Sequence, residues 1–171
     1  MLRAALLFAC SLLLAGCYES QDLLLNADAP SQPLRAGDYK ITNEEGEVSA
    51  VHVTPRSDGW YDISETEDGE DSGTHRVLLN ALDKDGARAL YAYAAYDSDE
   101  AAYIYGLIAI DAQGHVTKKD SDCHRDADAK IAVEKGGTKL VDSCQFYRND
   151  KALLAALTAL AQNPKHWDRI D

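Results

Sequence analysis

Long apolar runs, cysteine and positive charge are all scarce in this chain. The N-terminal apolar run covers residues 4–15, and because a membrane-spanning helix needs about 20 apolar residues, we expect no spanning helix there. The four cysteines form no C-x-x-C pair, which disfavours a zinc site and a redox-active dithiol.

Negative charge dominates, with 17 Lys and Arg against 29 Asp and Glu and a net charge of −12. Such a balance repels nucleic acid and anionic lipid surfaces, so we expect no nucleic-acid partner. Solubility is the simplest interpretation of the acidity. A cationic protein or cell-wall component as partner is the alternative.

Catalytic motifs are absent as well. The sequence contains no G-x-S-x-G, no H-E-x-x-H and no glycine-rich phosphate loop. The five histidines lie without the spacing of metal ligands, at His52, His75, His115, His124 and His166. We therefore predict no catalytic residue, no metal and no cofactor. An enzyme with an unrecognised site is the alternative.

Two acidic stretches, residues 64–73 and 97–100, are the best candidates for calcium binding. An EF-hand loop has Asp at position 1 and Gly at position 6. Counting back from Gly69 places Ser64 at position 1, so the spacing does not match. Solvated charge on hairpin turns is the simpler interpretation.

The N-terminus carries the most specific motif. A short positive start that includes Arg3 precedes the apolar run, as in a secretory signal. The run ends in "LAGC", residues 14–17, which resembles the lipobox of bacterial lipoproteins. The resemblance implies that residues 1–16 are a cleaved signal peptide and that Cys17 carries a diacylglycerol thioether and an N-acyl chain.

Location follows from the same resemblance. In the enterobacterial pattern, an Asp directly after the lipidated cysteine retains the protein in the inner membrane. Here Tyr18 occupies that position, which favours the outer membrane, with the protein facing the periplasm.

The remaining cysteines pair by elimination once this resemblance is accepted. Cys10 leaves with the signal and Cys17 is acylated, so Cys123 and Cys144 remain, 21 positions apart. In an oxidising compartment such a pair predicts a structural disulfide. A metal site or a redox pair is the alternative, and neither has its usual ligand spacing here.

Residues 17–36 are expected to form the lipidated cysteine and a flexible tether, because Pro30 and Pro33 lie among small polar residues. Three adjacent leucines, residues 23–25, interrupt this composition. They either dock on the domain or lie at the lipid surface, and we favour docking.

Residues 37–171 predict a single β-rich domain. Turn signals recur about every 8–14 residues between runs rich in Val, Ile, Tyr and Leu, which is typical of consecutive hairpins. We expect seven strands between Asp38 and Lys119. The fold class is mainly β (α+β), an antiparallel meander of about seven to nine strands that forms a barrel or a strongly curved sheet.

The C-terminal third is expected to contain a polar loop around Cys123 and a hairpin around Gly136 and Gly137. One C-terminal helix, residues 150–162, should pack its apolar stripe on the sheet after capping by Asn149 or Asp150. Pro164 should end this helix, and Trp167 should dock.

Two features form the candidate binding surface. Tyrosines crowd into two strands that are apolar on both faces, and they predict a cross-strand patch of Tyr91, Tyr93, Tyr96, Tyr103 and Tyr105. An acidic turn supplies Glu65, Glu67, Asp68, Glu70 and Asp71. Ordinary strand aromatics and a solvated turn are the simpler interpretations.

Three classes of function stay open. The first is a lipid-anchored, non-catalytic binding or accessory module of the cell envelope. The second is an inhibitor of a cationic periplasmic hydrolase of the lysozyme type; such inhibitors share a lipid anchor, a small β domain and a disulfide, although their signature loops are missing here. The third is an enzyme.

Overall fold

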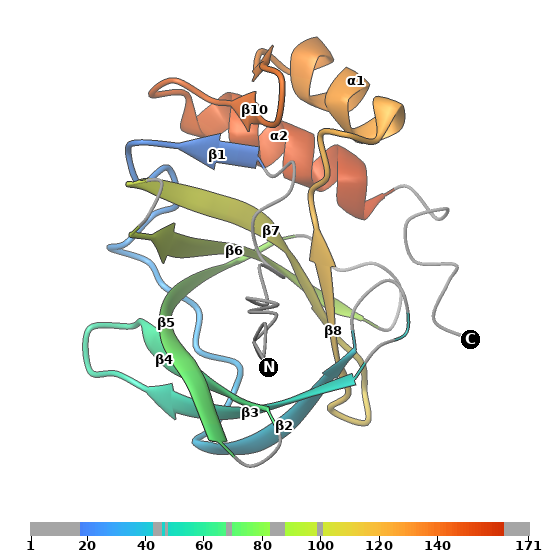
Figure 1. The fold of residues 1–171 in the computed structure, drawn as a ribbon. Coiled ribbons are helices and arrows are strands. Elements are labelled where there is room, and N and C mark those ends of the chain that lie inside the picture. The colour runs from blue at the N-terminus through green and yellow to red at the C-terminus, as the bar shows by residue number, and fades with distance from the viewer. Residues whose placement is uncertain are drawn as a thin grey trace, which may run out of the picture.

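The computed structural model describes residues 18–42, 46, 48–67, 70–82, 88–98 and 101–162, without the side chains of residues 66–67 and 70–72. Within these ranges the chain forms ten strands and two helices (Figure 1). In chain order they are β1 (Tyr18–Ser20), β2 (Gly37–Thr42), β3 (Val48–Pro55), β4 (Tyr61–Glu67), β5 (Glu70–Ala81), β6 (Ala89–Asp97), β7 (Ala102–Ile110), β8 (Val116–Asp120), α1 (Asp126–Glu134), β9 (Thr138–Lys139), β10 (Cys144–Gln145) and α2 (Asp150–Ala161).

Strands β2 to β8 form a closed barrel. Each pairs antiparallel with the next, and β8 returns to pair with β2 in parallel, with Ile41 opposite Val116. The parallel seam is a consequence of the odd number of strands, because the first and seventh strands of an up-and-down meander run in the same direction. The predicted antiparallel meander is confirmed, and β2–β8 match the seven expected strands. Of the two forms that the sequence left open, a barrel and a strongly curved sheet, the structure has the closed barrel.

The barrel interior is filled by side chains that alternate with outward-facing ones along each strand. In β5, Val77 and Leu79 point inward, whereas Leu78 belongs to a second cluster on the outside. All seven barrel strands contribute to the inner cluster, which includes Ile41, Val53, Tyr61, Leu79, Tyr93, Ile108 and Val116.

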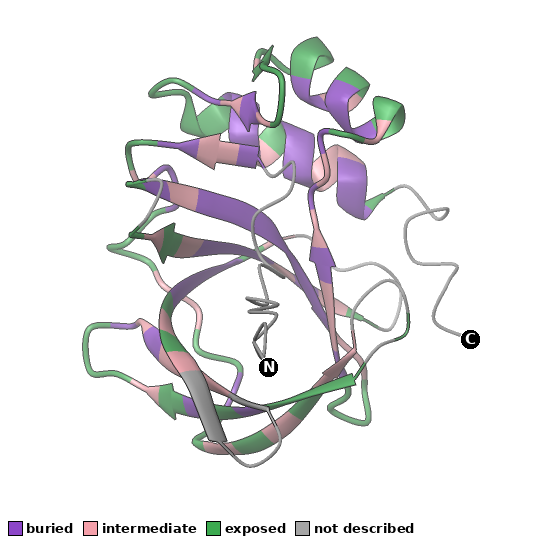
Figure 2. Ribbon diagram, viewed as in Figure 1, coloured by how far each residue is buried: buried purple, intermediate pink, exposed green. Residues whose placement is uncertain are grey.

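A second layer covers one side of the barrel. We call β1, β9, β10, α1 and α2 together the outer layer; in Figure 1 its helices lie above β1, β7 and β6. The outward faces of β6 and β7 present small and apolar residues such as Ala92 and Leu107, which are fully buried beneath it (Figure 2). These two strands, which the sequence shows to be apolar on both faces, are therefore covered on both faces.

Helix α2 forms where the sequence predicts it. The side chain of Asn149 accepts a hydrogen bond from the Ala152 N–H at 3.0 Å and so caps the first turn. The apolar stripe of Leu153, Leu157 and Leu160 is buried against the barrel wall. Pro164 and Trp167 lie outside the described residues.

Helix α1 replaces the hairpin that was expected around Gly136 and Gly137. Ala129 and Ala132, three positions apart, are buried on one face of the helix, and this spacing fits a helix rather than a strand. Gly136, with a φ of 103°, lies just after the helix end, where the Gly137 N–H donates to the Ala132 carbonyl at 2.8 Å. Within residues 130–141, where the hairpin was expected, only the two residues of β9 are strand.

The segment from residue 18 to residue 36 is not a flexible tether. It begins with β1 and then runs over the outer surface of the barrel, where Leu24 and Leu25 are buried. The predicted docking of the leucines is therefore confirmed. The Ser31 N–H donates to the Leu79 carbonyl at 2.8 Å, and Leu34 is buried in the inner cluster. The composition resembles a linker, but its apolar residues pack in the same clusters as the barrel.

Candidate functional site at the start of the folded chain

Strand β1 enters the sheet at the place where β8 leaves it. Along one edge of β7, β8 pairs as far as Gly106 opposite Asp120, and β1 takes over with Tyr18 opposite Tyr105. Strand β1 therefore continues the line of β8. Cys17, the predicted lipidation position, is the residue directly before this strand and lies outside the described residues.

Ser121 satisfies the backbone groups at this junction. The Tyr18 N–H donates to the Ser121 hydroxyl oxygen at 2.9 Å, and that hydroxyl donates to the Tyr105 carbonyl at 2.7 Å. Ser121 is buried, so each of these polar groups needs a partner inside the protein. The Ser121 hydroxyl, directly after β8, thus joins Tyr18 of β1 to Tyr105 of β7.

Tyr18 itself is fully buried between the sheet and α1. Its hydroxyl donates to the Asp128 carbonyl at 2.7 Å, and its ring centroid lies 5.2 Å from that of Phe146. Burial, with the nearby Asp128 charge, raises the pKa of Tyr18 far above its ordinary value. The first side chain of the described fold is therefore a core residue.

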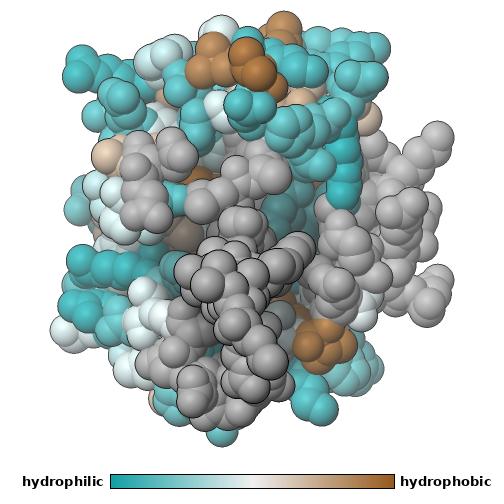
Figure 3. Space-filling view, in the orientation of Figure 1, coloured by the Kyte–Doolittle hydropathy of each residue, from teal (hydrophilic) through white to brown (hydrophobic). Residues whose placement is uncertain are grey.

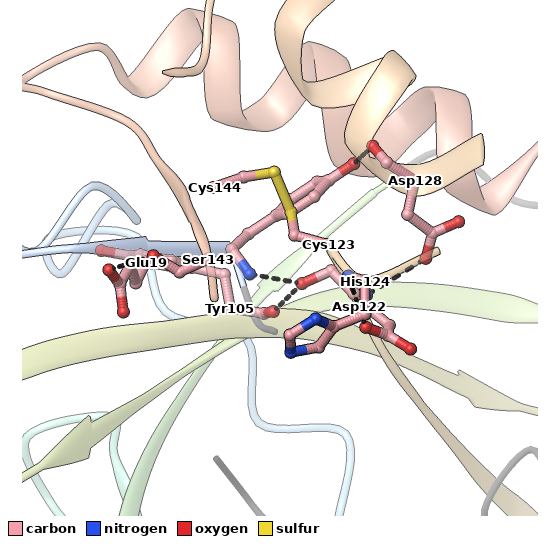
Figure 4. Close-up of a disulfide and its surroundings, with 10 residues drawn as sticks. Glu19, Tyr105, Asp122, Cys123, His124, Asp128, Ser143 and Cys144 are labelled. Carbon is pink, nitrogen blue, oxygen red and sulfur yellow. Dashed lines mark hydrogen bonds between the residues drawn. A yellow bond between two sulfur atoms is a disulfide. The ribbon is translucent and has the colours of Figure 1, made fainter. Parts of the chain in front are cut away.

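Strand β10 holds β1 from its other side, and the disulfide holds β10 (Figure 4). The two strands are parallel, with Tyr18 opposite Cys144, and Cys144 is bonded to Cys123 with 5.9 Å between their Cα atoms. The predicted disulfide is thus present in the structure. It ties β10 to the segment that leaves β8.

A polar contact across these strands adds to the disulfide. One carboxylate oxygen of Glu19 accepts hydrogen bonds from the Ser143 hydroxyl at 2.6 Å and from the Gln145 amide at 2.9 Å. The Phe146 N–H also donates to the Glu19 carbonyl at 3.0 Å. Strand β1 is therefore fixed to a hairpin more than 120 positions away.

The five tyrosines of the predicted patch do not share one surface. Tyr91 and Tyr93 face the barrel interior, whereas Tyr105 lies on the outer side and is fully buried. Tyr96 and Tyr103 are opposite each other across β6 and β7, with ring centroids 5.1 Å apart. The period of two and the register explain the split. Even positions of β6 lie opposite odd positions of β7, so Tyr91 and Tyr93 face the other side of the sheet from Tyr103 and Tyr105.

Tyr105 has a structural role under the crossing segment. Its hydroxyl accepts from the Leu24 N–H at 2.9 Å and donates to the Asp22 carbonyl at 2.9 Å. Burial raises the pKa of Tyr105, although the hydrogen bond from Leu24 opposes the rise. This tyrosine therefore holds the N-terminal segment in place and contributes nothing to an exposed patch.

The predicted acidic turn is mostly strand. Glu67 lies opposite Glu70 across β4 and β5, so two residues, Asp68 and Gly69, connect the strands, and both lie outside the described residues. Asp-Gly is the preferred dipeptide of a two-residue hairpin turn. Glu65 is half-buried in β4, and the backbone pairing places Asp71 in β5 opposite Thr66.

This hairpin extends beyond its neighbour. Pairing of β5 with β6 begins at Val77, whereas pairing with β4 begins at Glu70. Residues 70–76 of β5 therefore extend past the ladder with β6, at the barrel end where β6 finishes. The acidic residues of the sequence prediction lie along this extension.

A polar cluster inside the barrel was not predicted. Tyr93 donates a hydrogen bond to the Asp120 carboxylate, and the Lys118 ammonium lies 3.1 Å from a carboxylate oxygen of Asp120. The same ammonium is 5.7 Å from the Tyr93 ring centroid. The alternation of Val116, Lys118 and Asp120 in β8 was the available signal. The arrangement pairs the charges of Lys118 and Asp120 beside a buried ring.

Among the residues that the structure describes, no cluster of three or more His, Cys, Asp or Glu residues is arranged to hold a metal ion. Within the same residues, neither helix has the length and apolar character needed to cross a bilayer. No family model matches the chain, and no curated protein or solved structure matches it.

Proposed function

We propose that this chain is an exported bacterial lipoprotein, anchored through Cys17, that acts in the cell envelope as a non-catalytic binding or accessory module. Its main support is the position of β1, which begins one residue after Cys17 and is part of the fold. A cut between Gly16 and Cys17 removes none of the described residues, and the first hydrogen bond of the fold is made by the Tyr18 N–H.

The disulfide supports the same compartment. Disulfides persist in exported proteins and are rare in the reducing cytosol, and here the bond between Cys123 and Cys144 holds the strand next to β1. Because Tyr18 stands where an Asp would retain the protein in the inner membrane, the proposed location is the outer membrane, facing the periplasm.

The β4–β5 hairpin is the proposed partner-binding element. Its acidic residues lie on the part of the hairpin that β6 does not cover, although β3 pairs with its other side, and they would attract a cationic protein or cell-wall component. An inhibitor of a cationic periplasmic hydrolase of the lysozyme type is the second candidate. It is favoured by the same acidic hairpin, because negative charge is complementary to a cationic cleft.

Metabolic labelling with a fatty-acid probe tests the anchor. We expect Cys17→Ser to abolish the label and Cys10→Ser to retain it, since the resemblance assigns lipid to Cys17 alone. Equal labelling of the Cys17→Ser variant and the wild type would exclude the proposed anchor.

The binding role needs a partner, which a pull-down from intact envelopes with the lipidated protein would supply. Replacing Glu65, Glu67, Asp68, Glu70 and Asp71 by Ser or Asn should slow association and weaken its salt dependence, because exposed charges are screened beyond about 8 Å at physiological ionic strength. An on-rate indifferent to salt and to these changes removes the hairpin from binding. Turnover of an envelope substrate, lost on changing one polar residue, would contradict the non-catalytic role.

A further inference from the structure

The tip of the β9–β10 hairpin exposes apolar side chains that the fold does not use. Leu140 is 41% exposed and Val141 is 87% exposed, the highest value among the large exposed hydrophobic residues described. The tip is ordered by a hydrogen bond from the Leu140 N–H to the Ser143 carbonyl at 2.8 Å. Figure 3 shows apolar surface at the top of the view, over the region of this hairpin and α1.

The register places this tip beside the start of the chain. Because β1 and β10 are parallel, with Tyr18 opposite Cys144, the residues that precede both strands leave the sheet at the same end. Strand β9 runs antiparallel to β10, with Lys139 opposite Cys144, so the residues after Lys139 also emerge at that end. The exposed tip and the proposed lipid attachment therefore lie on one edge of the outer layer.

The distance between Cys17 and the hairpin tip is short. The Cys17 Cα must lie within about 3.8 Å of the Tyr18 Cα, whatever the conformation of Cys17. Neighbouring strands are about 4.8 Å apart, so two strand spacings bring the tip to about 10 Å from Tyr18. The polar layer on each side of a bilayer is about 5–8 Å thick. Since Tyr18 is fixed in the core, no slack chain separates the lipid from this edge.

The chemistry of the tip suits a membrane interface. Val141 and Leu140 would leave water on contact with lipid, which is favourable in proportion to the apolar area buried. The flanking charges, Lys139 and Asp142, have opposite signs. The tip therefore lacks the strong negative charge of the whole chain, which would oppose contact with anionic lipid.

We infer that the tip, residues 140–143, docks into the membrane interface beside the acyl chains on Cys17 and so fixes the orientation of the domain on its membrane. This inference rests on the proposed lipidation of Cys17. The bilayer is the occupant of the patch, because the attachment point is one residue from the fold and the tip lies at the same edge.

Depth-dependent quenching tests the docking. In the lipidated protein, Cys17 is acylated and the other two cysteines are bonded to each other, so an introduced cysteine is the single free thiol. A fluorophore sensitive to polarity is attached to Val141→Cys or, as a matched control, to Val48→Cys, which replaces an exposed valine of β3. Each protein is placed in phosphatidylcholine vesicles with brominated acyl chains.

We expect the label at position 141 to shift to shorter wavelength and to lose most of its emission to the quencher, while the label at position 48 keeps its value in water. Equal exposure of the two labels overturns the docking. Mass spectrometry of the N-terminal lipopeptide from the same sample separates the causes: lipid present with an unquenched label refutes the docking alone, and lipid absent refutes the proposed function as well.

A second copy of the chain is the competing occupant. Sedimentation of the Cys17→Ser variant without vesicles should show a monomer. A dimer that Val141→Asp dissociates would show that the patch binds another copy, and that result also overturns the docking.

Discussion

The barrel and the outer layer are built from different kinds of contact. In the barrel, each strand pairs with the next in the chain, as where Pro55 lies opposite Tyr61 across a short turn, and the seam between β2 and β8 is the exception. In the outer layer, Tyr18 contacts Asp128 at a separation of 110 positions, and Glu19 contacts Gln145 at 126. The layer that carries the proposed anchor therefore forms only when the two ends of the chain meet.

This difference has a consequence for stability. Closing a long loop costs more conformational entropy than closing a short one, so the contacts of the outer layer must offset a larger cost. The disulfide between Cys123 and Cys144 lies in this layer and restricts the unfolded chain only over the 21 positions that it spans, so it leaves the cost of the longer separations in place. We expect the outer layer to open at lower free energy than the barrel, as parts of a protein often do independently.

Matched leucine truncations should separate the two regions most strongly. Leu79 lies in the barrel interior and Leu153 beneath the outer layer, and both are essentially fully buried. Each change to Ala should cost about 2–5 kcal/mol. Amide exchange should show that Leu79→Ala weakens both regions, whereas Leu153→Ala weakens mainly β1, β10 and α1. Identical amide exchange patterns in the two variants would contradict the separate opening of the outer layer and the barrel.

Loss of the disulfide should also weaken mainly the outer layer. The double change of Cys123 and Cys144 to Ser should lower the free energy of unfolding by about 3 kcal/mol, because the loop closed by the bond becomes free in the unfolded chain. Urea titration measures the loss, and exchange should rise in β10 before β4. Unchanged stability would mean that the bond does not hold the layer.

The junction at Ser121 should respond to a single hydroxyl. Ser121→Ala leaves the Tyr18 N–H and the Tyr105 carbonyl without their buried partner, which should cost about 1–3 kcal/mol. Ser64→Ala is the control, because the Ser64 hydroxyl is hydrogen-bonded to Thr74 on an exposed face of the barrel. Equal losses of unfolding free energy in urea titrations of the two variants would show that the Ser121 junction stabilises the protein no more than an exposed hydroxyl does.

High pH should produce an effect that grows gradually rather than at once. Burial raises the pKa of Tyr18 and of Tyr105 above the ordinary value of about 10, so their stabilising effect is complete below pH 10 and declines as pH rises further. The loss approaches about 1.4 kcal/mol per pH unit for each tyrosine. Tyr18→Phe keeps the ring but cannot ionise, so it should flatten the alkaline decline. The same slope in both proteins would contradict this assignment.

The barrel could be predicted from the sequence because its signals are local. Turn residues such as Asp68-Gly69 and the alternating apolar runs lie within single hairpins, and hairpins in series predict a meander. The capped stripe of α2 is equally local. In both cases neighbouring residues carry all of the information that the prediction needs.

The outer layer could not be predicted in the same way. Tyr18–Ser20 is too short to show a period, and its partners Ser121 and Cys144 lie far along the chain. Pro30 and Pro33 suggested a linker, although Leu34 beside them enters the inner cluster. Helix α1 was missed because the short apolar run 131–133 also fits a strand. The candidate site lies where local pattern is weakest, apart from Cys17 and the disulfide.

Amide hydrogen exchange of the exported protein tests most directly whether the chain folds from the residue after Cys17, the proposed lipidation site. The N–H groups of Tyr18, Leu24 and Asn26 all donate within the fold. The peptide that covers residues 18–26 should therefore stay protected at times when an unstructured chain has exchanged completely, and Ser121→Ala should reduce its protection. Exchange of this peptide at the rate of an unstructured chain would contradict the account and restore a flexible tether between lipid and domain.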